Sequence, residues 1–339
     1  MARLKPRPDT NGTARTLTSA MMANSETWAE RVIAGDRRAI ARAISAVENQ
    51  DETAIALVKL LFRRSRAALV AGITGAPGSG KSTLAGKLAA HYRESGLRVG
   101  IIAVDPTSPF SGGAILGDRV RMQDLAADDG VYIRSMATRG QLGGLAPATH
   151  DVVTVLEAAG CRIVLIETVG VGQDEVDVAR LADVTLLLLV PGMGDEVQTF
   201  KAGVMEIADI FVINKADRPG ADRLEQELTA MRAITPEREG WQPPVVKTVA
   251  TTGEGVPALG QTLDRFQRFG QENRLALLRG RRKWRARLLE LLRQMLLSRV
   301  VSRHLEDGLM DSRIEAILER RSDPHSVVEE MVAASMREG

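Results

Sequence analysis

A glycine-rich segment of this chain has the spacing of a phosphate-binding loop. Residues 75–83 read Gly-Ala-Pro-Gly-Ser-Gly-Lys-Ser-Thr, directly after an apolar run. Glycines at this spacing let successive backbone N–H groups surround phosphate oxygens without side chains in the way. The residues expected at the phosphates are Gly75, Ala76, Pro77, Gly78, Ser79, Gly80, Lys81, Ser82 and Thr83.

Two side chains of this loop have specific expected roles. Lys81 is expected to reach the β and γ phosphates, and Ser82 to offer its hydroxyl to Mg²⁺. Residues 84–94 have a helical pattern, which would point the positive end of a helix at the anion. A purely structural glycine turn is the alternative, and the flanking strand and helix patterns favour nucleotide binding.

Acidic residues come directly after two other apolar runs. These residues are Asp105 and Glu167. Facing the loop serine, they would provide hard oxygen ligands for Mg²⁺ or its waters, and Asp118 is a further candidate. The N–H of Gly170 would meet the γ phosphate. The alternative for each acid is a helix-capping role.

The segment Asn-Lys-Ala-Asp at 214–217 follows a later apolar run and predicts a guanine site. The Asp217 carboxylate can accept hydrogen bonds from guanine N1–H and the exocyclic amino group. Adenine would place a lone pair against it, at a cost of roughly 1–3 kcal/mol. The pattern therefore favours GTP over ATP. The residues expected around the base are Asn214, Lys215, Asp217, Val249, Ala250 and Thr251, the last three through backbone groups.

Hydrolysis is expected to be slow without a partner. In Ras-type GTPases a glutamine after the switch glycine orients the attacking water, and here Val171 takes that place. Lys201, in a glycine-containing segment after another apolar run, either reaches the nucleotide or is a surface lysine. The candidate catalytic residues are Lys81, Glu167, Lys201 and Asp105.

The elements that must position these residues alternate along the chain. Seven short apolar runs are separated by helical segments, and they lie at 69–73, 99–104, 131–133, 163–166, 184–190, 210–213 and 245–249. This order predicts an α/β fold with a doubly wound, mostly parallel sheet. Ligands of such sheets bind at the carboxyl ends of the strands, where the candidate site residues lie.

Composition limits the classes of function. The 339 residues are 44% apolar with a net charge of +2, so nothing global argues for nucleic acid, and no apolar run is long enough to span a bilayer. The single cysteine, Cys161, fits a reducing compartment and a small core residue better than a reactive thiol. We expect a cytoplasmic protein. An Arg/Ser/Thr-rich start leaves a transit peptide, and hence the mitochondrial matrix, as the alternative.

The chain is expected to have four parts. These are a disordered tail (1–22), an N-terminal helical extension (23–66), a P-loop GTPase domain (67–270) and a C-terminal helical extension (271–339). Residues 279–303 carry nine Lys or Arg against one acid, with apolar residues at helical spacing. That pattern favours a packing or dimer helix with a solvated basic face over a phosphate-backbone binder.

Six motifs in order resemble the MeaB/ArgK family of GTPases, whose human member is the methylmalonic aciduria type A protein. The motifs lie at 75–83, 103–108, 112–119, 167–173, 194–198 and 214–217. The resemblance covers roughly residues 25–299, and the tail after about 303 has no match. One departure is the loop 249–251, Val-Ala-Thr in place of Ser-Gly or Ser-Ala, so base contacts there must come from the backbone.

The resemblance implies a homodimeric, SIMIBI-type P-loop GTPase that uses GTP/GDP and Mg²⁺. It implies a chaperone that assists cofactor loading and protection of adenosylcobalamin-dependent methylmalonyl-CoA mutase or a related acyl-CoA mutase. On the family pattern Asp105, Asp118 and Glu167 are switch acids, and Lys201 serves partner-stimulated hydrolysis.

Two other functions compete with this one. A metal-insertion GTPase would share the sheet order, but the four histidines are scattered and no Cys-x-x-Cys occurs. An ArgK-like kinase of amino-acid transport proteins would use ATP, against which Asp217 argues.

Overall fold

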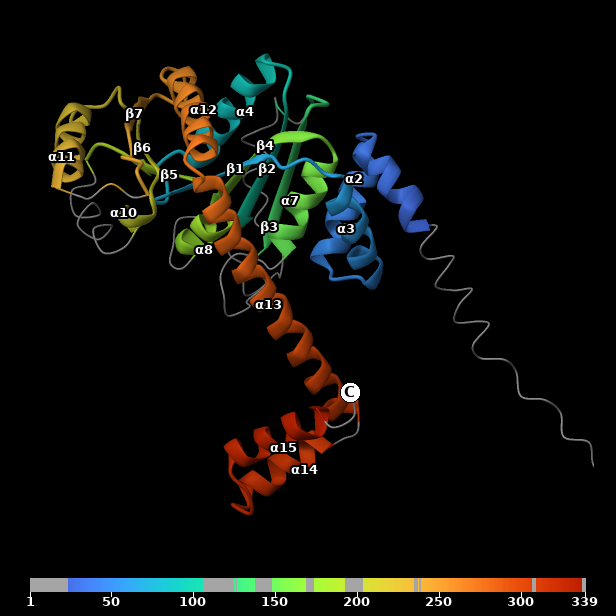
Figure 1. The fold of residues 1–339 in the computed structure, drawn as a ribbon. Coiled ribbons are helices and arrows are strands. Elements are labelled where there is room, and N and C mark those ends of the chain that lie inside the picture. The colour runs from blue at the N-terminus through green and yellow to red at the C-terminus, as the bar shows by residue number, and fades with distance from the viewer. Residues whose placement is uncertain are drawn as a thin grey trace, which may run out of the picture. The chain divides into compact units, whose positions relative to one another are not determined.

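The structure is a computed structural model in which two compact units can be distinguished. The residues it describes are 24–105, 125, 127–137, 148–168, 174–192, 204–234, 237, 239–306 and 309–336. The first unit extends to Ala276 and the second begins at Leu277, so the division falls inside one helix, α13 (Leu275–Glu306). Figure 1 shows the helices and strands of both units.

The first unit is built on a seven-stranded sheet in the order β3-β2-β4-β1-β5-β6-β7. Every strand pairing is parallel, which confirms the α/β, doubly wound fold and makes the sheet wholly rather than mostly parallel. All seven apolar runs are strands. Their bounds are β1 (Leu69–Gly75), β2 (Arg98–Asp105), β3 (Val131–Ala137), β4 (Cys161–Thr168), β5 (Val184–Leu189), β6 (Ile210–Asn214) and β7 (Val245–Thr248).

Helices cover both faces of the sheet (Figure 1). Helices α4 (Lys81–Glu94) and α12 (Val256–Glu272) pack on one face, and α7 (Ala148–Ala158) and α8 (Asp174–Leu181) on the other. Along β1 the side chains alternate between the two, so that Ile73 packs with α4 and Val70 with α7 and α8. Helices α10 (Val204–Ile207) and α11 (Ala221–Ile234) lie towards the β6 side.

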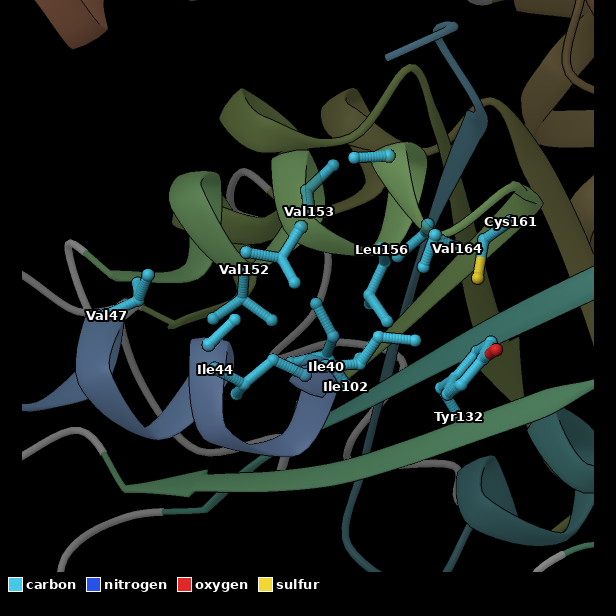
Figure 2. Close-up of a cluster of buried hydrophobic side chains, with 14 of the residues drawn as sticks. Ile40, Ile44, Val47, Ile102, Tyr132, Val152, Val153, Leu156, Cys161 and Val164 are labelled. Atoms are coloured by element: carbon cyan, nitrogen blue, oxygen red, sulfur yellow. The ribbon is translucent and has the colours of Figure 1, made fainter. Parts of the chain in front are cut away.

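The N-terminal helices share a core with the sheet. Residues 24–33 are helical, followed by α2 (Arg37–Glu48) and α3 (Glu52–Arg64). Asp36 caps α2 through its side chain, and its hydrogen bond with Arg31 lowers the pKa of its carboxyl. Figure 2 shows Ile40 and Ile44 of α2 beside the side chains of α7, above the sheet. The extension therefore forms a further layer of the first unit, outside α7.

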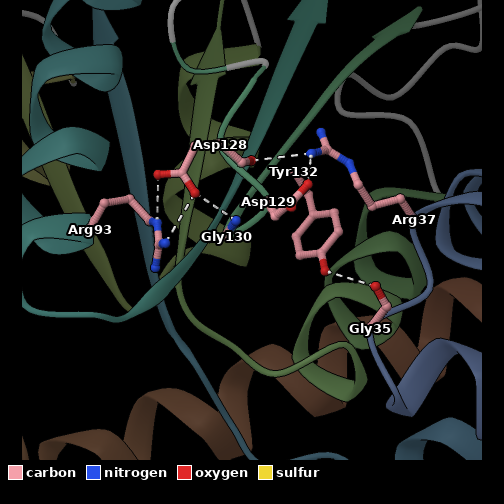
Figure 3. Close-up of polar contacts among 7 residues, drawn as sticks. All are labelled: Gly35, Arg37, Arg93, Asp128, Asp129, Gly130 and Tyr132. Carbon is pink, nitrogen blue, oxygen red and sulfur yellow. Dashed lines mark hydrogen bonds and ion pairs between the residues drawn. The ribbon is translucent and has the colours of Figure 1, made fainter.

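Polar contacts hold the same layer to the edge strand β3. The hydroxyl of Tyr132 donates to the Gly35 carbonyl at 3.4 Å, and Arg37 contacts the Asp129 carboxylate at 2.9 Å (Figure 3). Arg134, also on β3, donates to the side chains of a serine and a glutamate of α2. These contacts join the N-terminal extension to β3 through side chains.

Cys161 begins β4 and is fully buried. Burial raises the pKa of its thiol to about 12. Because the thiolate is the reactive form, this cysteine is the inert core residue expected from the sequence.

The second unit consists of α13 from Leu277 onward, α14 (Leu309–Leu318) and α15 (Pro324–Met336). Many large apolar side chains on these helices are exposed, and those that are buried include Val327 and Met331 of α15. No helix among the residues described is both long and apolar enough to cross a bilayer.

Candidate functional site

The loop after β1 has a backbone that only glycine accommodates at two positions. Gly75 has φ +142°, and a Cβ there would lie 2.4 Å from the Leu188 carbonyl oxygen. Gly80 has φ +95°, and a Cβ there would lie 2.4 Å from Nδ2 of Asn214. Both glycines thus allow a close approach as well as a turn. The loop leads into α4, whose N-terminal N–H groups face the carboxyl edge of the sheet.

Lys81 is the first residue of α4, and its side chain folds back over the loop. Its Nζ donates to the carbonyl oxygens of Gly75 at 2.8 Å and Ala76 at 2.9 Å, and the residue is 5% exposed. The loop carbonyls therefore hold the ammonium group inside the ring of backbone that an anion would enter. Such an arrangement supplies positive charge at the phosphate position expected from the sequence.

Ser82 and Glu167 lie together although 85 residues separate them. The Ser82 hydroxyl donates to Oε1 of Glu167 at 2.5 Å, and both side chains are buried. Ser82 is the second residue of α4, and Glu167 is the penultimate residue of β4, which pairs with β1. A hydroxyl and a carboxylate at this spacing are hard oxygen donors that fit Mg²⁺, with phosphates and water as its other ligands.

Asp105 ends β2, which pairs with β4 through Ala103 and Glu167. Its backbone therefore lies at the same sheet edge as the Ser82 pair. Three other predicted site residues, Asp118, Gly170 and Lys201, lie outside the described residues.

Asn214 connects the phosphate loop with the loop after β7. Its Nδ2 donates to the Ser79 carbonyl at 2.7 Å, while its Oδ1 accepts from Ala250 N–H at 3.1 Å and from the Thr248 hydroxyl at 3.2 Å. The residue is 1% exposed. One buried amide thus pairs with three groups from two segments, which fixes the two loops relative to each other.

The second residue of the Asn-Lys-Ala-Asp motif also contacts the phosphate loop. Lys215 adopts a left-handed backbone, φ 56°, and its Nζ donates to the Gly78 carbonyl at 2.7 Å. Asp217 is exposed two residues later, so its carboxylate is available to a base at this edge.

Two backbone N–H groups expected at the base have partners within the protein. The Ala250 N–H, which the sequence placed against the base oxygen, donates instead to Asn214, and the Val249 N–H donates to the Glu254 carbonyl. Buried donors take the nearest protein acceptor when one is in reach. Thr251 is exposed, and its backbone contact with the base stays a prediction.

The connecting roles of Asn214 and Lys215 were not anticipated from the sequence. One signal existed: Asn214 is a polar residue at the end of a fully buried strand, and a buried amide requires partners. The pattern identified the motif but not the two carbonyls of the phosphate loop that it binds.

We predict that Asn214→Ala lowers the free energy of unfolding by about 2–4 kcal/mol, since it leaves buried partners unpaired. Urea unfolding followed by circular dichroism would measure this. The matched control is Asp217→Ala in the same loop, which should change stability by no more than about 0.5 kcal/mol because that side chain is exposed. Equal stabilities of the two variants would show that Asn214 does not brace the loops.

Comparisons with known proteins agree with this geometry. The family model "Methylmalonyl Co-A mutase-associated GTPase MeaB" matches residues 40–307. A putative GTPase of Pyrococcus horikoshii is 47% identical over 306 residues, which are 88% of this chain and 95% of that protein. The mitochondrial methylmalonic aciduria type A homolog of Mus musculus is 37% identical over 254 residues, 70% of this chain and 61% of that protein.

Two further matches carry other names, GTPase ArgK and LAO/AO transport system kinase. The GTPase ArgK of Escherichia coli is 35% identical over 257 residues, 73% of this chain and 78% of that protein. A solved structure described as a LAO/AO transport system kinase has a TM-score of 0.68 at 24% identity, covering 92% of this chain and 96% of that one, and shows the shared fold. The family match spans the sheet, both loops and all of α13, and the chain therefore belongs to the MeaB family of GTPases.

Proposed function

We propose that this protein binds GTP across the carboxyl edge of its sheet and hydrolyses it to GDP and phosphate. The observation that carries the proposal is the hydrogen bonding of Asn214, which links the phosphate loop to the loop after β7. Phosphate groups occupy the loop from Gly75 to Thr83, and guanine lies against Asp217. Family membership supports the activity.

In this proposal Lys81 exchanges partners when GTP binds. Its ammonium group leaves the carbonyls of Gly75 and Ala76 for the β and γ phosphate oxygens. Until then the two carbonyl oxygens hold the ammonium group, so its positive charge is in position before the nucleotide binds. Because the Lys81 side chain is already fixed, it needs little rearrangement when the reaction takes place.

Ser82 and Glu167 would hold Mg²⁺, either directly or through its waters. The ion would neutralise charge that develops on the phosphate oxygens. To hold the ion, the Ser82 oxygen would turn towards it and away from Glu167. Asp105 at the end of β2, Asp118, the N–H of Gly170 and Lys201 remain proposed members of the site.

We propose an adenosylcobalamin-dependent acyl-CoA mutase as the partner, served as a chaperone in cofactor loading and protection. The family description names methylmalonyl-CoA mutase, and the mouse relative is named for methylmalonic aciduria. The absence of a switch glutamine, with Val171 in its place, supports slow hydrolysis until this partner binds.

We also propose a homodimer formed through the second unit. The apolar side chains Trp284, Leu288, Leu292 and Met295 share one face of α13, and all are at least 44% exposed. Such a stripe on a long helix is stable when a second apolar face covers it. The family resemblance points to a second copy of this chain as that face.

Asp217→Asn tests the base contact. Losing hydrogen bonds to a charged acceptor should weaken GTP binding by about 3 kcal/mol, or about 100-fold. Xanthosine triphosphate should gain affinity, because its C2 carbonyl accepts from the new amide while N1–H donates to it. Titration of both nucleotides into both proteins would measure the change. Unaltered GTP affinity in the variant would show that guanine lies elsewhere.

Turnover with a purified mutase tests the chaperone role. We expect the mutase to accelerate GTP hydrolysis at least about tenfold, a change of about 1.4 kcal/mol in the barrier. Lys81→Ala is the control, since it removes the phosphate contact and should show no turnover with or without the mutase. A wild-type rate unaffected by mutase would exclude the chaperone mechanism while leaving the GTPase intact.

A further inference from the structure

Three buried threonine hydroxyls of the first unit make no hydrogen bond within the part of the chain that the structure describes. They belong to Thr74, Thr149 and Thr168, each at most 1% exposed. An unpaired buried hydroxyl costs about 1–3 kcal/mol. Isosteric valine would avoid that cost, so three such groups in one region require an explanation.

Thr74 and Thr168 lie on neighbouring strands and the same face of the sheet. In the register of β1 with β4, Ile73 pairs with Glu167, so the next residues, Thr74 and Thr168, are side by side. Side chains alternate along a strand. Because Glu167 faces Ser82 at the start of α4, both threonines face the opposite layer, that of α7 and α8.

Thr149, on α7, faces the ends of β1 and β4 where Thr74 and Thr168 lie. It precedes Leu156 by two helical turns on the buried side of the helix, and Leu156 lies against Gly100 of β2 (Figure 2 shows Leu156 over the sheet). Seven residues of helix span about 10 Å. The helix runs antiparallel to β2, so Thr149 reaches the level of Val104, which pairs with Thr168.

We propose that these three hydroxyls bind one internal water molecule beneath the nucleotide site. A buried water typically makes about three hydrogen bonds, and three hydroxyls, each both donor and acceptor, match that number. Val104 and Ile166 belong to the core on this face of the sheet, and their apolar side chains offer the water no competing partner.

The water would act on hydrolysis through Glu167. It joins the ends of β1 and β4 on one face, while the Ser82 and Glu167 pair joins α4 to β4 on the other. Thr168 directly follows Glu167, so fixing its side chain fixes the backbone that aims the carboxylate. The three threonines are thus positioning residues, and this inference rests on the proposed GTP hydrolysis.

The test compares two triple variants with the wild-type protein. Thr74→Val/Thr149→Val/Thr168→Val keeps the shape and expels the water, whereas the corresponding triple serine variant keeps the hydroxyls. The valine variant without nucleotide should unfold at the same or a higher urea concentration than wild type. It should hydrolyse GTP about tenfold more slowly with unchanged KM, and the serine variant should stay within about twofold of the wild-type kcat.

Several outcomes would overturn the water site. They are wild-type kcat in the valine variant, an equal loss in the serine variant, or a valine variant that is less stable or does not fold. Thr168→Val alone should also lower kcat, but by less than the triple valine variant. A high-resolution crystal structure should place a water within hydrogen-bond distance of all three hydroxyls, and hydroxyls bonded to backbone there would contradict the site. Absence of GTP hydrolysis by wild type would instead refute the proposed function.

Discussion

The two halves of the proposed nucleotide site depend on one buried amide. Asn214 ends β6, two strands away from β1, yet it donates to the phosphate loop and accepts from the loop after β7. A nucleotide that contacts both loops needs them at a fixed separation, and hydrogen bonds inside the protein fix it before any ligand binds. Gly80 is required by the same contact, because any side chain there would occupy the space of the amide.

The parallel sheet explains why residues far apart in sequence meet. All seven strands present their carboxyl ends at one edge, so Lys81, Glu167 and Asn214 converge without long excursions of the chain. Alternation of side chains then assigns each residue to a face. Glu167 is directed to the face of α4 and the phosphate loop, and Thr168 to the layer that also carries the N-terminal helices.

Sequence reasoning predicted the strands of the sheet and the turn between β1 and α4, because apolar runs and glycine spacing are local signals. All seven strands were predicted, and the loop at Gly75 leads into α4 as expected. It did not predict the partners of Asn214, or that the Ala250 N–H would bond to the protein, since those contacts join segments 135 and 36 residues apart in the sequence. It also did not anticipate that α2 would pack on α7, since amphipathic periodicity shows that a helix has a buried face but not which element covers it.

The central claim is that this edge of the sheet selects guanine through Asp217. Isothermal titration of the wild-type protein with GTP and with ATP, each with Mg²⁺ and under the same conditions, tests it most directly. The account predicts that GTP binds at least about 100-fold more tightly, which corresponds to about 2.7 kcal/mol. Equal affinity for the two nucleotides would contradict it.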